Sequence, residues 1–144
     1  MKKISGIMPA LITPLTACEK INVPVLRSLI EHHISQNADG FYIGGATGEG
    51  FLLSTDARKT LCEKAVEYIG DAATKIVHIT DMNIERTLEL ARHAEKCGAD
   101  AISAVPPFYF EYDEDDIYNY YARIAGSVNI PLMIYYTPSA AVTV

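Results

Sequence analysis

The sequence has few basic residues and no long apolar run. Its 144 residues include 12 Lys and Arg against 18 Asp and Glu, a formal net charge of −6. Nucleic acids and anionic membrane surfaces favour clustered Lys and Arg, so we expect neither as a partner. The sequence contains no run of 18 or more apolar residues, which a membrane-spanning helix would need. Met1-Lys2-Lys3 is not followed by the apolar core and cleavage site of a signal peptide. These absences predict a cytoplasmic protein with no membrane partner.

Cysteine is also scarce. Cys18, Cys62 and Cys97 are odd in number and widely spaced along the sequence. This spacing matches neither a disulfide framework nor a zinc ligand set, which indicates a reducing compartment and no metal. We therefore expect the three thiols to be buried and structural.

The sequence does contain a regular alternation of short apolar runs and amphipathic segments. Strands are predicted at five nearly all-apolar runs, 7–13, 40–44, 75–80, 101–105 and 131–135. Such runs are typical of parallel strands that are buried on both faces. Helices are predicted between them, beginning at Asn22, after Ser54, at Asn83 and at Asp113. The acidic residues 114–116 complement the dipole of the fourth helix, so we do not expect them to bind a metal.

Five parallel strands with right-handed crossovers leave two folds open, a doubly wound sheet and part of a (β/α)8 barrel. Both place their functional residues at the carboxyl ends of the strands. Polar and unusual residues gather there in this sequence, at Thr13-Pro14, 44–50, Thr80-Asp81, 106–110 and Tyr135-Tyr136. A doubly wound nucleotide-binding domain is the weaker alternative, because no G-x-G-x-x-G follows the first predicted strand.

The segment Gly44-Gly45-Ala46-Thr47-Gly48-Glu49 follows the second predicted strand. Glycines let backbone N–H groups turn toward an anion, and Thr47 adds a hydroxyl donor, so the segment suits a carboxylate or a phosphate. It is not a P-loop, because the G-x-x-x-x-G-K-[ST] order is absent. A plain tight turn remains the alternative.

Two tyrosines and a histidine also stand at strand ends or in the loops beyond them. Tyr135 ends the fifth predicted strand, where a phenol can act as a general acid or base if a neighbouring cation lowers its pKa. A packed ring with a hydrogen-bonded hydroxyl is the alternative. Tyr109 lies in an aromatic loop after two prolines and is typical of an interface. His78 and Asp81 are three residues apart on a strand, so they point to opposite faces and are not expected to share a metal.

Four motifs occur in a fixed order, PALITP at 9–14, GGATGE at 44–49, SAVPPFY at 103–109 and IYYTP at 134–138. Together they resemble the N-terminal part of the N-acetylneuraminate lyase and dihydrodipicolinate synthase superfamily, over essentially the whole chain. The resemblance implies an α/β fold, the N-terminal part of a (β/α)8 TIM barrel with about five strands and four helices. Residues 1–144 would then form one incomplete barrel domain of an oligomer. The implied chemistry is a Schiff-base aldolase acting on pyruvate, without a cofactor.

The resemblance also implies roles for individual residues. Thr47 and the amides of Gly45, Ala46 and Gly48 would bind the carboxylate of a 2-keto acid, which fixes it for attack. Tyr135 would move protons beside the Schiff base. Tyr109 would reach toward the site of a neighbouring subunit.

The aldehyde substrate is indicated by a difference between branches of the superfamily. The synthase branch has an arginine where this sequence has Ala140, which disfavours aspartate semialdehyde. Gly44-Gly45 and 103–105 are more similar to the sialic acid lyases, which cleave N-acetylneuraminate to N-acetylmannosamine and pyruvate. A dihydrodipicolinate synthase-like enzyme or a sugar-acid aldolase is the alternative.

The sequence departs from the superfamily pattern in three ways. Ala46 replaces a Ser or Thr that relays protons, and Tyr136 and Val142 replace an Asn and a Gly. The Schiff-base lysine belongs about 30 residues beyond Tyr135, one βα unit further on. Only Lys20 could substitute from the correct face, and a solvated lysine stays protonated.

We therefore expect no turnover by this chain alone. The remaining strands would come from a homo-oligomer or from a complementing C-terminal half-barrel, because open sheet edges recruit another chain. A non-catalytic half-barrel that serves as an assembly subunit is the alternative.

Overall fold

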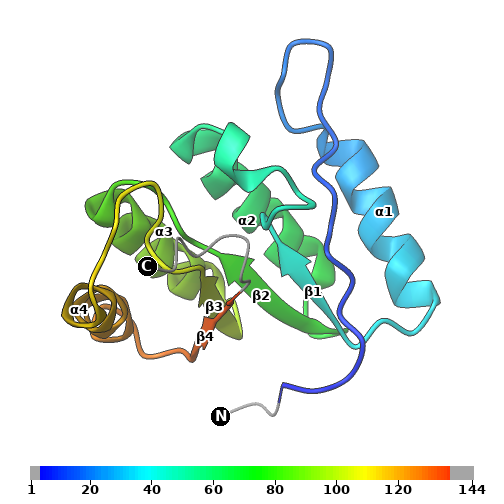
Figure 1. Cartoon of the computed structure of the whole chain (residues 1–144). Coiled ribbons are helices and arrows are strands. Elements are labelled where there is room, and N and C mark those ends of the chain that lie inside the picture. The colour runs from blue at the N-terminus through cyan, green and yellow to red at the C-terminus, as the bar shows by residue number, and fades with distance from the viewer. Residues whose placement is uncertain (1–3, 137–144) are drawn as a thin grey trace.

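Four parallel strands form one sheet in the computed structural model, which describes residues 4–136 (Figure 1). The strands are β1 (Gly40–Ile43), β2 (Thr74–His78), β3 (Ala101–Ala104) and β4 (Leu132–Ile134), paired in the order β1-β2-β3-β4. Between or before them lie the helices α1 (Val23–Ser35), α2 (Thr55–Ile69), α3 (Ile84–Cys97) and α4 (Glu114–Ala125), with a 3-10 turn η1 (Gly50–Leu52) ahead of α2. A strand order that follows chain order, with a helix between each pair, is the repeated βαβ arrangement.

The prediction of a regular strand at 7–13 is wrong. This segment lies parallel to β1, but it joins β1 only through an isolated bridge between Ala10 and Tyr42. Tyr42 N–H donates to Pro9 C=O at 3.0 Å, and Leu11 N–H donates to Tyr42 C=O at 2.9 Å. Pro9 has no N–H to donate, which interrupts a regular ladder. The segment still occupies the sheet position next to β1, and the other four strand predictions are confirmed to within two residues.

All four predicted helix starts are confirmed. In each first turn a backbone N–H donates to the side chain of the predicted N-cap residue: Asn22, Ser54, Asn83 or Asp113. None of the helices in the described part of the chain is both long and apolar enough to cross a bilayer. Seven residues named in the sequence predictions lie outside the described residues: Met1, Lys2, Lys3, Thr137, Pro138, Ala140 and Val142.

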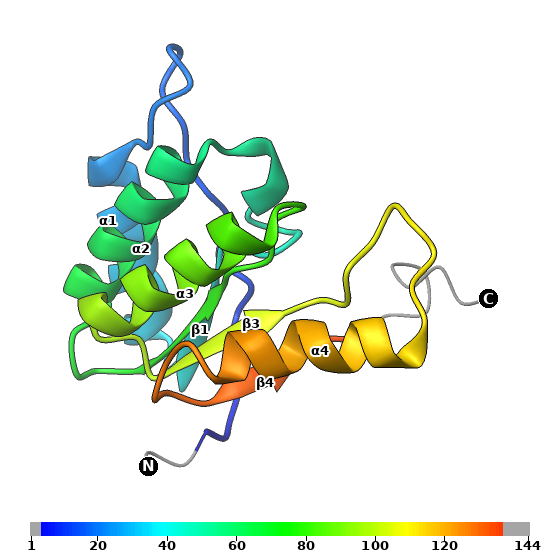
Figure 2. The ribbon, with the colours of Figure 1, turned by 90° about the vertical axis from the view of Figure 1, so that its left-hand side faces the viewer.

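The helices line one face of the sheet (Figures 1 and 2). Strand residues alternate between the two faces, and those that point toward the helices form the core with apolar helix residues. The strand members of this core include Phe41, Ile43, Val77, Ile102 and Ala104. The alternate residues Tyr42, His78 and Ser103 point to the opposite face, which would be the inner face of a closed barrel. That face carries the polar groups described next.

Candidate functional site

The glycine-rich turn after β1 is held by hydrogen bonds at its second half. Glu49 N–H donates to Ala46 C=O at 2.9 Å, and Gly50 N–H donates to Gly45 C=O at 3.1 Å. The buried Thr13 hydroxyl donates to Gly48 C=O at 2.6 Å and ties the turn to the N-terminal segment. These contacts give the turn a defined shape in the absence of a ligand.

The first half of the turn keeps its donors available. Within residues 4–136, the amides of Ala46, Thr47 and Gly48 and the Thr47 hydroxyl donate to no other group. Ala46 and Thr47 are both exposed. A plain tight turn accounts for the bonds at Glu49 and Gly50. An anion site would need donors without an internal partner, such as these, and the anion site stays a prediction.

Gly45 is required because of a side chain that sequence reasoning missed. A Cβ at Gly45 would lie 2.4 Å from Cε1 of Tyr42, closer than non-bonded carbons approach. The ring of Tyr42 therefore packs directly against the turn. Its other neighbour is Tyr135, with ring centroids 5.9 Å apart and an interplanar angle of 50°. Tyr42 thus connects the glycine turn after β1 to the tyrosine that follows β4.

Hydrogen bonds fix the position of Tyr42. Its hydroxyl donates to Ser103 Oγ at 3.0 Å, and the Ser103 hydroxyl donates to Met133 C=O at 3.1 Å. These two hydrogen bonds connect β1 to β3 and β3 to β4. Burial raises the pKa of the Tyr42 phenol, the Ser103 hydrogen bond opposes that shift, and Tyr135 adds to it. The Tyr42 phenol is therefore uncharged at neutral pH, and its hydrogen bond to Ser103 holds it in place.

Tyr135 and Tyr109 occupy different surroundings. Tyr135 N–H donates to Ala104 C=O at 2.8 Å, so the residue continues the β4 edge, and its side chain is 46% exposed beside Tyr42. Tyr109 is 73% exposed, has a φ of 85°, and stacks edge-on against Phe110. Among the described residues, no ring contact joins Tyr109 to Tyr42 or to Tyr135. The two predicted tyrosines are therefore not brought together within one chain.

A buried arginine and histidine support the strand ends beside this site, and the sequence did not single out the arginine. Arg58, 5% exposed, donates to Thr80 C=O at 2.8 Å and to His78 C=O at 3.0 Å. The His78 ring packs against Tyr42 and Phe51. Burial, reinforced by Arg58 and opposed by the Gly44 backbone, lowers the pKa of His78 to about 4. Asp81 instead pairs with Arg86, at 2.8 Å, and lies 3.9 Å from Arg58.

The described lysines are engaged away from the turn or exposed. Lys75 donates to Gly70 C=O at 2.8 Å and lies 3.6 Å from Asp100, which confirms its place at the amino end of its strand. Lys59 pairs with Glu89 and Lys64 with Glu67 on helix surfaces. Lys20 is exposed in the loop before α1. Within residues 4–136 no lysine contacts Thr47, Tyr42 or Tyr135.

A one-sided parallel α/β sheet with polar residues at the strand ends defines part of a (β/α)8 barrel with its site at the carboxyl ends of the strands. The sequence profile of the Dihydrodipicolinate synthetase family matches residues 3–144, and the chain belongs to this family. The resemblance noted from four sequence motifs is confirmed, as is the fold class.

The chain is similar to individual N-acetylneuraminate lyases and to other members of the family. The N-acetylneuraminate lyase of Clostridium perfringens is 39% identical over 136 residues, which cover 94% of this chain and 47% of the relative. A structure of CdNal from Clostridium difficile in complex with mannosamine has a TM-score of 0.93 at 38% identity, covering 96% of this chain and 48% of that one. A structure of YagE from E. coli in complex with pyruvate has a TM-score of 0.91 at 30% identity, covering 94% and 45%. The chain therefore spans about half the length of the relatives it matches.

Proposed function

We propose that this chain supplies the N-terminal half of a Schiff-base aldolase that cleaves N-acetylneuraminate to N-acetylmannosamine and pyruvate. The observation that carries the proposal is the contact series from Gly45 through Tyr42 to Tyr135. It links the glycine-rich turn to a half-exposed phenol on one side of the sheet. A carboxylate held at the turn would place the neighbouring carbon atoms of a keto acid near that phenol.

Different residues would have different roles in such a reaction. The Thr47 hydroxyl and the amides of Gly45, Ala46 and Gly48 would bind the keto-acid carboxylate through charge-assisted hydrogen bonds. A lysine amine outside these 144 residues would condense with the keto carbon and release water. The resulting iminium accepts the electron pair when the carbon–carbon bond breaks, and the hydroxyl proton of the departing aldehyde must move to a base. Tyr135 would relay that proton.

The aldehyde assignment rests on the relatives. The two similar structures are complexes with mannosamine and with pyruvate, an amino sugar and a 2-keto acid. These are the chemical classes that sialic acid cleavage would release. The alternative assignments are a dihydrodipicolinate synthase-like enzyme and a sugar-acid aldolase, each with the same keto-acid half-site and a different aldehyde.

The open side of the sheet suggests how the site is completed. In the described part of the chain, β4 has a partner only on its β3 side. Ile134, Tyr135 and Tyr136 are exposed there by 60%, 46% and 57%. We propose that residues 1–144 form one incomplete barrel domain in the cytoplasm. A C-terminal half-barrel would complete it and supply the lysine, whereas a second copy would cover the sheet edge without supplying the nucleophile. Tyr109 would contact a neighbouring subunit in that assembly.

Borohydride trapping with pyruvate tests the proposal. The full chain would be incubated alone and after co-refolding with the C-terminal half of the Clostridium perfringens lyase, and each polypeptide would be weighed by mass spectrometry. We expect no adduct on the chain alone, and an adduct on the C-terminal half only when the chain is present. Release of N-acetylmannosamine from N-acetylneuraminate by the mixture would identify the aldehyde.

Two results would contradict the proposal. A stable adduct on the isolated chain would place the nucleophile within it, and a well-folded mixture without any adduct would favour the non-catalytic assembly subunit. A Tyr135→Phe chain should bind the C-terminal half normally but turn over at least ~100-fold more slowly. Tyr118→Phe, an exposed tyrosine on α4, is the matched control.

A further inference from the structure

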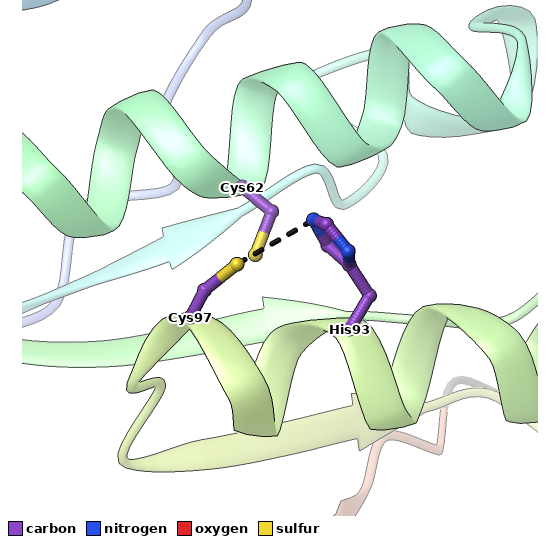
Figure 3. A group of neighbouring side chains, drawn as sticks. All are labelled: Cys62, His93 and Cys97. Atoms are coloured by element: carbon purple, nitrogen blue, oxygen red, sulfur yellow. Dashed lines mark hydrogen bonds between the residues drawn. The ribbon is translucent and has the colours of Figure 1, made fainter.

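A group of sulfur and nitrogen atoms lies between α2 and α3, on the helical side of the sheet. Cys62 comes from α2, and His93 and Cys97 come from α3, and their side chains point toward one another (Figure 3). One potential ligand atom from each of the three residues lies within 4.8 Å of the other two. Cys62 is buried, whereas His93 and Cys97 are partly exposed. The proposed aldolase function does not use this group.

The spacing of these atoms matches a tetrahedral zinc site. Zinc binds Cys sulfur at about 2.3 Å and His nitrogen at about 2.0 Å, so neighbouring S and N ligands lie about 3.5 Å apart. The distance from Cys97 Sγ to His93 Nε2 is 3.4 Å. Two thiolates on one zinc lie about 3.8 Å apart, within the 4.8 Å limit that the group meets. An ion could bind here with only small side-chain movements.

A carboxylate lies beside the three-residue group. Glu63 Oε1 lies 3.2 Å from His93 Nε2. Glu63 follows Cys62 on α2, and its side chain is 52% exposed. A surface groove lined by Glu63, Cys97 and Gly98 gives an ion a route from solvent.

We propose that Cys62, His93 and Cys97 bind one zinc-type divalent cation, which clamps α2 to α3, and that water or the Glu63 carboxylate, after a side-chain movement, takes the fourth position. Binding converts two thiols to thiolates, so two protons leave for each ion that enters. Affinity should fall as pH decreases, because protons compete with the ion for both sulfurs.

A disulfide between Cys62 and Cys97 is the competing use of the same atoms. Its formation needs an oxidant, whereas binding of a divalent cation needs none. A disulfide also gives no role to His93 or Glu63. The convergence of the His93 nitrogen with the two sulfurs is accounted for by an ion and not by a sulfur–sulfur bond.

Titration of the reduced, metal-free full chain with Co²⁺ tests the site. We expect one Co²⁺ per chain, thiolate-to-cobalt charge-transfer absorption in the near ultraviolet, and the strong visible bands of a tetrahedral site. One equivalent of Zn²⁺ should abolish these bands. Cys97→Ser should remove about half of the charge-transfer intensity and weaken binding by more than the 10–100-fold typical of outer-shell changes. Cys18→Ser and His32→Gln, both exposed residues elsewhere, should leave binding unchanged.

A second measurement does not depend on any variant folding. Zn²⁺ should slow alkylation of Cys62 and Cys97 in the wild-type chain and leave the exposed Cys18 equally reactive, as followed by peptide mass spectrometry. Absence of cobalt bands together with equal alkylation rates would overturn the proposal. So would a wild-type chain that, purified in air, contains a Cys62–Cys97 disulfide and binds no cobalt after reduction.

Discussion

The phenol rings of Tyr42 and Tyr135 lie with their centroids 5.9 Å apart, although 93 positions separate them in the sequence. Tyr42 stands on β1 and Tyr135 follows β4, at opposite sides of the described sheet. Sheet curvature must bring the two outer strands toward each other for these rings to meet. The contact is thus a direct sign that the sheet is curling toward a barrel, and it places the phenol of Tyr135 on the same side as the glycine turn.

Replacing Tyr42 with Phe should weaken this arrangement without abolishing it. The change removes the hydroxyl that donates to Ser103, while Ser103 keeps its own bond to Met133 C=O. We expect a loss of about 1 kcal/mol in the free energy of unfolding, measured by urea denaturation. Tyr118→Phe is the matched control, because that tyrosine is 72% exposed. Equal effects of the two changes would show that the Ser103 hydrogen bond contributes nothing.

Adding a methyl group at Gly45 should be costly because of Tyr42. The new Cβ would lie 2.4 Å from Cε1 of the ring, so the ring or the turn must move. We expect Gly45→Ala to destabilise the chain by about 1–3 kcal/mol. In a Tyr42→Ala background the same change should cost much less, since the obstructing ring is gone. A double-mutant cycle by chemical denaturation measures this coupling, and strict additivity would contradict the packing described here.

Much of the fold could be predicted from local patterns. Asn22, Ser54, Asn83 and Asp113 mark helix starts because capping depends on residues close in sequence. The segment 7–13 was predicted as a strand because it is apolar, and the missing N–H of Pro9 prevents the regular ladder. An apolar sequence predicts that a segment is buried beside a sheet. It does not predict whether the segment has the backbone N–H groups that a regular strand ladder needs.

The site was less predictable, because its contacts connect distant segments. Sequence reasoning selected Thr47 and Tyr135 but missed Tyr42, whose role depends on which strands curl together. Period-two alternation along 41–43 does place Tyr42 on the opposite face from Phe41 and Ile43, and that was the available signal. The cysteines were expected to be buried, which is wrong for the exposed Cys18. The i,i+4 spacing of His93 and Cys97 on one helix was the available sign of their proximity.

His78 should make stability depend on pH. Its pKa is lowered to about 4 in the folded chain by burial and by Arg58, against about 6.5 when unfolded. The unfolded chain therefore binds a proton more readily, and stability is lost as pH falls below about 6.5 toward 4. We expect a loss of about 2 kcal/mol between pH 7 and pH 5 from this residue. The loss should be absent in His78→Phe and retained in His32→Gln, as measured by urea denaturation at both pH values.

Arg58 should be one of the most sensitive positions for stability. Its guanidinium satisfies the backbone carbonyls of Thr80 and His78 where water has little access. Arg58→Ala leaves both carbonyls without this donor and should cost about 3 kcal/mol or more. Arg92→Ala, an exposed arginine on α3, should change stability by less than about 0.5 kcal/mol. Arg58→Ala should also raise the pKa of His78 and so reduce the loss of stability between pH 7 and pH 5. If that loss is the same in Arg58→Ala as in the wild-type chain, Arg58 does not influence the pKa of His78.

Ala46 offers a direct test of whether the turn takes part in proton transfer. It is exposed and its φ is not in the left-handed region, so a β-branched residue should fit with little loss of stability. Ala46→Thr and Ala46→Val add side chains of nearly equal shape, and only threonine supplies a hydroxyl. In the mixture with the C-terminal half of the Clostridium perfringens lyase, we expect the threonine variant to cleave N-acetylneuraminate at least ~10-fold faster than the valine variant. Equal rates in two equally stable variants would mean that no hydroxyl at position 46 relays a proton to Tyr135, and that the turn only binds the carboxylate.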